Sequence, residues 1–200
     1  MADRCSNLSF RQASTTSRYV ALTAVLAALY SVYGYISGIA LRSVTRSLDL
    51  FFLLPVFFAI LVSLTGKRWS SALLGTIIGL LFLYPTAGVP LSPHITIALI
   101  VNGLVFDLYL LESKTSTYDL SRKQLITAGT LGNLAMAVSG LLVFQFFIGA
   151  QTVEVWAIAL IGDTIVGAIG GFFGAVVVER VKGVQTRRVL EAKSSLKVRA

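Results

Sequence analysis

Six long blocks of this sequence carry almost no charge, and this pattern restricts what the chain can fold into. The blocks are Tyr19–Ala40, Asp49–Thr65, Trp69–Pro90, Ile95–Leu111, Leu125–Gln151 and Val155–Val178. A helix needs about 20 apolar residues to cross the hydrocarbon core of a bilayer. Four blocks reach that length, whereas the second and fourth are shorter and contain Pro55 and Asp107, respectively. The pattern predicts an all-α integral membrane protein, a bundle of six transmembrane helices.

The composition agrees with a membrane protein of one domain. Only 13% of the 200 residues are charged and 56% are hydrophobic, whereas soluble domains carry about 25% charged residues. The first apolar block is too long for the core of a signal peptide, so we expect it to be retained as a helix. Cys5 is the only cysteine, which excludes an internal disulfide and a thiol-pair metal site.

The basic residues indicate how the bundle is oriented. With six spans both termini lie on one side, and that side collects 15 of the 17 Lys and Arg residues, leaving Arg42 and Arg46 on the other. Because basic loops stay inside, we predict cytoplasmic termini in a multi-pass protein of the cell membrane. The predicted parts are a flexible N-terminus (residues 1–18), a membrane domain (19–180) and a basic tail (181–200). The net charge of +8 is thus mainly a topology signal, with attraction to lipid headgroups, and nucleic acid is not an expected partner.

Small residues recur four apart, a spacing that lets helix backbones approach closely. The third block contains Ser71, Gly75 and Gly79, and the sixth contains two series that start at Gly167 and Gly170. For these two blocks, packing within the bundle is the ordinary interpretation. The first block differs, because its Ala24 and Ala28 lie near its cytoplasmic start.

The opening helix "ALTAVLAALYSVYG" and the closing helix "GDTIVGAIGGFFGAVVVER", with a basic tail, resemble a known family. The chain is similar, over roughly residues 17–182, to the substrate-binding S component of an energy-coupling factor (ECF) vitamin transporter. The resemblance implies that Ala24 and Ala28, together with Ala21, pack against a transmembrane coupling subunit. It also implies partner ATPase subunits, a vitamin-like substrate bound near the outer side, and no cofactor.

Three polar residues lie at similar depth in the outer half of the predicted bundle. Asp163 is the only charged residue between Glu154 and Glu179, and a bare carboxylate in an apolar span is costly unless something requires it. At about 1.5 Å per residue, Asp163 lies about 12 Å below the outer end, Asn102 about 10 Å and Gln145 about 9 Å. We expect these three side chains to line a pocket that opens to the outside.

Trp156 extends this prediction on the last helix. Because residues seven apart differ by about 20° in azimuth, Trp156 and Asp163 share a face, which Gly167, Gly170 and Gly174 continue. An indole ring above a carboxylate suits a flat cationic or amine-bearing ligand. Since no Lys or Arg lies within a span, the partner of the carboxylate is a ligand cation, a hydrogen-bond donor or a proton. A structural carboxylate bonded to neighbouring helices remains an alternative.

Four further polar residues have weaker assignments. His94 and Tyr84 are candidate substrate contacts near the outer ends, where interfacial histidines and aromatic-belt tyrosines are also common. Asp107 lies near the cytoplasmic end, where we expect it to reach the interface, and Asn133 is interpreted as an interhelical hydrogen bond.

No enzyme motif is recognisable. The sequence has no GxSxG, HExxH or phosphate-binding GxxxxGKS/T motif, and its single histidine cannot build a multi-histidine metal site. We therefore expect a non-enzymatic capture subunit for a vitamin or related molecule, with a thiamine-like or pyrimidine-bearing substrate as one interpretation. The alternatives are a small cation- or proton-coupled transporter or channel that uses Asp163, and a membrane scaffold or enzyme with an unrecognised site.

Overall fold

The structure, a computed structural model, describes residues 2–40, 48–83, 93–112, 120–147 and 149–198. These residues form six helices and no strand: α1 (Ala2–Ala40), α3 (Leu48–Thr65), α4 (Ser70–Leu83), α5 (Pro93–Glu112), α6 (Arg122–Phe147) and α7 (Val153–Val198). Each helix except α1 begins within a few residues of the start of an apolar block. Helix α1 begins well before its block, and α7 ends well after its block. The all-α prediction is confirmed for the described part of the chain.

Five of these helices are long and apolar enough to cross a membrane. The exception is α4, which has 14 residues and is therefore about 21 Å long, against a hydrocarbon core of about 30 Å. The rest of its apolar block, residues 84–92, lies outside the described residues. The protein is thus a multi-pass membrane protein, and a complete sixth span remains a prediction.

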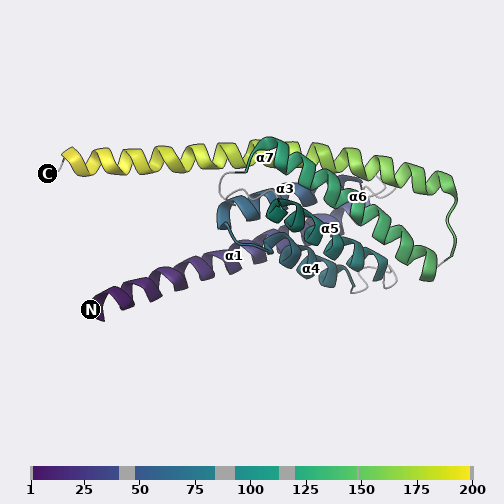
Figure 1. Ribbon diagram of the computed structural model, residues 1–200, viewed down its shortest axis with the longest axis horizontal. Coiled ribbons are helices and arrows are strands. Elements are labelled where there is room, and N and C mark those ends of the chain that lie inside the picture. Colours follow the sequence, from purple (N-terminus) through teal and green to yellow (C-terminus); the bar gives the residue numbers. More distant parts are fainter. Residues whose placement is uncertain (1, 41–47, 84–92, 113–119, 148, 199–200) are drawn as a thin grey trace.

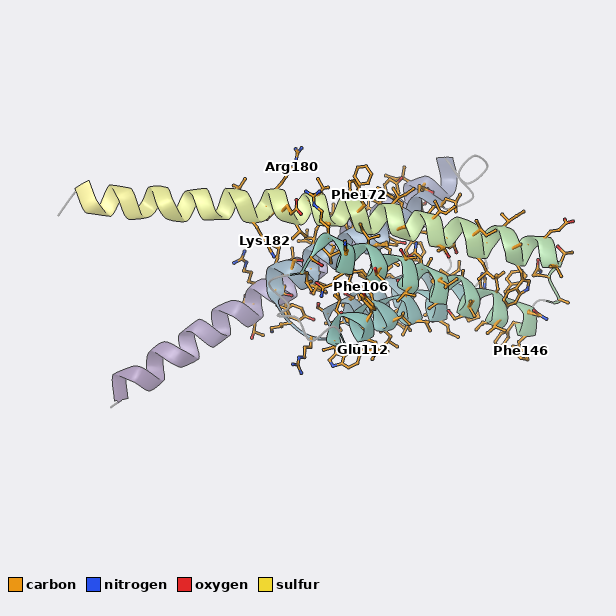
Figure 2. The ribbon with its side chains drawn as sticks, turned by 45° about the horizontal axis from the view of Figure 1, so that its top comes forward. Phe106, Glu112, Phe146, Phe172, Arg180 and Lys182 are labelled. Carbon is orange, nitrogen blue, oxygen red and sulfur yellow. The ribbon has the colours of Figure 1, made fainter. Side chains whose placement is uncertain are left out.

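The two termini project from the same end of the bundle. Figure 1 shows α1 and α7 running beyond the other helices and diverging toward N and C. Helix α1 begins at Ala2, so residues 2–18 lie within the same helix as the first apolar block. Helix α7 continues to Val198, so that residues 181–198 of the basic tail extend the last helix. In Figure 2, Arg180 and Lys182 lie toward this end and the exposed Phe146 lies at the opposite end.

The cytoplasmic placement of the termini can be tested by thiol labelling. In a Cys5→Ser background, a cysteine at Gly88 should react with an impermeant thiol reagent added outside intact cells. A cysteine at Ser116 should react only after the membrane is opened, because the basic loops are expected inside. Both positions lie outside the described residues. The reverse labelling pattern would contradict the charge-based orientation.

Helix α7 packs along α3 on one side and α6 on the other, and α5 packs against both α4 and α6. Glycines allow these close approaches. A Cβ atom added at Gly167 of α7 would lie 2.5 Å from the carbonyl oxygen of Gly129 in α6, and one at Gly75 of α4 would lie 2.6 Å from that of Leu99 in α5. The small residues of the third and sixth blocks therefore serve packing within the bundle, as predicted.

Asp107 is a structural residue at the end of the bundle from which the termini project. The sequence predicts that its carboxylate reaches the interface, and this prediction is wrong, because the residue is buried. Its Oδ2 atom accepts a hydrogen bond of 2.8 Å from the backbone N–H of Ala72, in the first turn of α4. The first N–H groups of a helix have no intrahelical acceptor, and the helix dipole favours a carboxylate there. Asp107 of α5 therefore caps α4, which explains how a carboxylate is tolerated inside.

Candidate functional site

The α3–α6–α7 junction is the place where these three helices meet around Pro55 and Asn133. Pro55 has no N–H, so the Phe51 carbonyl of α3 loses its intrahelical donor. The Nδ2 atom of Asn133 donates to this carbonyl over 3.1 Å. The same amide accepts, through Oδ1, a hydrogen bond of 2.9 Å from Nδ2 of Asn102 in α5. Asn133 is therefore an interhelical hydrogen-bonding residue, as predicted.

Asn102, a predicted substrate contact, is fully buried within this network. Besides Asn133, its Nδ2 atom approaches the sulfur of Met136 at 3.3 Å. Its Oδ1 atom is buried without a hydrogen-bond partner among the described residues; it faces Gly132, where an added Cβ would lie 2.4 Å away. The structure thus assigns Asn102 a role in joining α5 to α6, and a direct ligand contact remains a prediction.

Asp163 lies one helical turn outward from the junction. Four residues later on the same face of α7, Gly167 packs against the Asn133 side chain: a Cβ added there would lie 2.7 Å from Asn133 Cβ. Gly162 approaches Leu48 of α3, so Asp163 lies level with the first turn of that helix. Ile158, Ile161 and Ile165 are exposed on the opposite side of α7. The carboxylate therefore faces the bundle interior and the isoleucines face lipid.

The burial of Asp163 is almost complete, with 6% of its surface exposed. Among the described residues, no hydrogen bond or ion pair to its carboxylate is present. By contrast, Glu179 of the same helix forms an ion pair of 2.5 Å with Arg122 of α6, toward the end from which the termini project. A buried carboxylate without a donor is expensive in the membrane interior, so Asp163 is the residue best suited to receive a donor from outside the chain.

The remaining predicted contacts lie further out. Trp156 is half-buried on the Asp163 side of α7, whereas Gln145 is exposed on α6. His94, in the first turn of α5, is half-buried and its ring packs edge-on against Phe144 of α6, with 5.1 Å between centroids. Tyr84 lies outside the described residues. Along the bundle axis, Asn102 thus lies deepest, followed by Asp163 and then Trp156, which is nearest the end opposite the termini. Gln145 faces away from the interior.

A groove of about 490 Å³ opens between α5 and α6. Its walls are apolar apart from Ser139, whose hydroxyl donates to the Met136 carbonyl over 3.1 Å. None of the predicted substrate contacts lines this groove. Since specific ligand sites need a few converging polar groups, it lacks the chemistry expected of a substrate site.

Helix α1 presents two different faces. Thr23, Ala27 and Tyr30 are buried against the bundle, whereas the three predicted coupling residues, Ala21, Ala24 and Ala28, are exposed on the opposite side. They therefore do not take part in packing within the described chain. The three alanines form a stripe of small side chains beside the exposed Val25 and Leu29, and such a stripe lets another helix approach closely.

A solved structure has a similar arrangement of helices. No family model and no curated protein matches the sequence. A solved structure described as the crystal structure of an S-component of ECF transporter matches with a TM-score of 0.57 and 16% identity, over 94% of this chain and 97% of that chain. This chain has the fold of an ECF S component. The resemblance seen in the opening and closing helices is thus confirmed at the level of the fold.

A polar contact at the end of the bundle opposite the termini was not among the predicted site residues. Asp49, in the first turn of α3, accepts hydrogen bonds through Oδ2 from the hydroxyls of Tyr33, at 3.0 Å, and Ser37 in α1. Tyr30 also donates to the Leu50 carbonyl over 3.2 Å. Asp49 thus has donors where Asp163, at similar height, has none among the described residues. The four-residue spacing of Tyr33 and Ser37 was the available signal, because it places both hydroxyls on one helix face.

Proposed function

We propose that this protein is the substrate-capture subunit of an ECF-type importer. The observation that carries the proposal is the S-component fold, which extends over nearly the full length of both chains. The chain would bind a vitamin or related small molecule from outside the cell. A partner module of transmembrane coupling and ATPase subunits would then energise import, since the sequence has no phosphate-binding loop of its own.

The interior carboxylate supports a substrate that offers hydrogen-bond donors or a positive charge. Asp163 is nearly buried and receives no donor from the described residues. Trp156, two turns outward on the same side, offers an aromatic surface for a flat ring. A protonated amine, an amidine or an aminopyrimidine would donate a hydrogen bond to the carboxylate and pack against the indole ring. A thiamine-like or pyrimidine-bearing vitamin is therefore the first substrate to test, with Asn102, His94, Tyr84 and Gln145 as further proposed contacts.

The exposed alanines of α1 support the proposed coupling role. Ala21, Ala24 and Ala28 form a stripe of small residues on the exposed face of α1, with no partner helix in the described chain. In a bilayer, faces of this type drive helix association because they permit close van der Waals packing. We propose that this face receives the coupling subunit.

Affinity purification from native membranes tests the function directly. The tagged protein is expected to recover a coupling subunit and ATPase subunits, and native mass spectrometry is expected to detect a bound vitamin-sized molecule. Repeating the purification from cells grown without that molecule should yield the ligand-free protein. Recovery of the chain alone, with no vitamin bound and no vitamin uptake on expression beside an ECF module, would contradict the proposal.

The unpaired carboxylate also favours one alternative. A membrane-embedded acid without a basic partner is a common element of proton and cation pathways. In reconstituted liposomes that contain only this protein, such a transporter would move protons or cations without ATPase subunits, and Asp163→Asn would abolish that flux. A capture subunit is expected to show no flux in the same assay.

A further inference from the structure

We infer that Asn133 is a positioning residue of the proposed substrate site, acting as the replacement for the backbone donor that Pro55 removes from α3. The inference deepens the proposed function and rests on it for the meaning of Asp163. Proline in the interior of a helix leaves the carbonyl four residues earlier without its donor. Inside a membrane no water can compensate, so another group of the protein must supply the hydrogen bond.

The structure identifies the group that does so. The carbonyl freed by Pro55 belongs to Phe51, and the Asn133 amide of α6 donates to it over 3.1 Å. Asn133 itself is fully buried and is oriented by the hydrogen bond that it accepts from Asn102. The two hydrogen bonds leave Asn133 with one defined amide orientation, because Nδ2 must face α3 and Oδ1 must face α5.

The hydrogen bond between Asn133 and Phe51 lies about one helical turn below Asp163. Asn133 packs directly on Gly167 of α7, one turn below the carboxylate, and Gly170 packs on the Phe52 carbonyl, where an added Cβ would lie 2.5 Å away. From α6, Gly129 approaches Cβ of Pro55, at 3.1 Å from an added Cβ. Figure 1 shows α3, α6 and α7 close together. The proline, the amide and the α7 glycines therefore fix the depth and direction of the helix segment that carries Asp163.

A double-mutant cycle tests the donor replacement. Asn133→Ala should lower the thermal unfolding midpoint of the purified protein by about 3 °C or more, because the Phe51 carbonyl is left without a donor. Pro55→Ala returns an N–H to α3 and keeps the Cβ atom that faces Gly129. In the Pro55→Ala background, Asn133→Ala should therefore cost less than half as much. Equal costs in both backgrounds would overturn the inference.

Asn102→Ala is the matched control, because it removes the other hydrogen bond of Asn133 and leaves the Phe51 carbonyl paired. Its cost should depend on the Pro55→Ala background much less than the cost of Asn133→Ala does. If Asn133→Ala alone cannot be recovered folded, the same prediction applies to yield: the double variant Pro55→Ala/Asn133→Ala should be recovered. Failure to recover the double variant, while Pro55→Ala alone is recovered, would overturn the inference.

A second measurement separates positioning from stability. Asp163→Cys is introduced in a Cys5→Ser background, and the rate of its reaction with a small water-soluble thiol reagent is measured on the purified protein. Asn133→Ala should change this rate severalfold, and adding Pro55→Ala should restore it. An unchanged rate would remove the positioning role. Neither measurement uses a ligand, so failure of the inference is distinguishable from failure to bind a vitamin.

Discussion

Asp163→Asn is expected to weaken substrate binding roughly ten- to a hundred-fold, since a charged hydrogen bond contributes about 1.5–3 kcal/mol. The amide has nearly the shape of the carboxylate, so the packing of α7 on α3 and α6 should persist. It offers no charge to a cationic or donor-bearing ligand. Binding is measured by calorimetry with the molecule identified by native mass spectrometry, and with thiamine as the first probe.

Two variants show whether such a loss arises from the site or from the fold. Trp156→Ala should also weaken binding, because it removes the aromatic surface above the carboxylate while leaving the helix crossings intact. Gly170→Leu should instead lower the yield of folded protein, because even a Cβ atom at this position would lie 2.5 Å from the Phe52 carbonyl oxygen. Normal expression of Asp163→Asn with unchanged affinity would show that the carboxylate is not a ligand group, and a structural or proton-carrying role would then replace the proposed one.

Ala24→Trp and Ala28→Trp are each expected to abolish uptake while leaving substrate affinity within a few-fold of the parent protein. Both alanines are exposed on α1, opposite the buried face that includes Ala27. An indole at either position leaves the bundle undisturbed but prevents a second helix from approaching closely. Uptake of labelled substrate is measured in cells that contain the coupling and ATPase subunits, and complex recovery is measured in parallel.

Val32→Trp provides the matched control for this face. Val32 is 60% exposed on α1 and lies nearer its C-terminal end, and it already carries a branched side chain. Its replacement should reduce uptake much less than the alanine variants do. Full uptake and normal complex recovery in both alanine variants would exclude this face as the coupling surface.

The sequence by itself determined that the chain is helical and which residues share a face on α1 and on α7. Lipid requires every backbone polar group to be bonded within its own helix or by a neighbour, so long uncharged blocks already specify helices. Helical periodicity likewise places Ala24 and Ala28 on one face of α1, where both are exposed, and Asp163 on the glycine face of α7. These predictions depend only on residues within one segment, which is why they agree with the structure.

The tertiary structure alone decided which polar groups meet. The sequence shows Pro55, Asn102 and Asn133 on three separate blocks, and nothing local reveals that one amide bonds both the Asn102 side chain and the carbonyl that the proline frees. Asp107 also differs from its predicted place at the interface, because the N–H group that it caps belongs to another helix. Hydrogen bonds between helices depend on rotation, depth and crossing geometry. These are set by the packing of all the helices together and are not encoded in any single one.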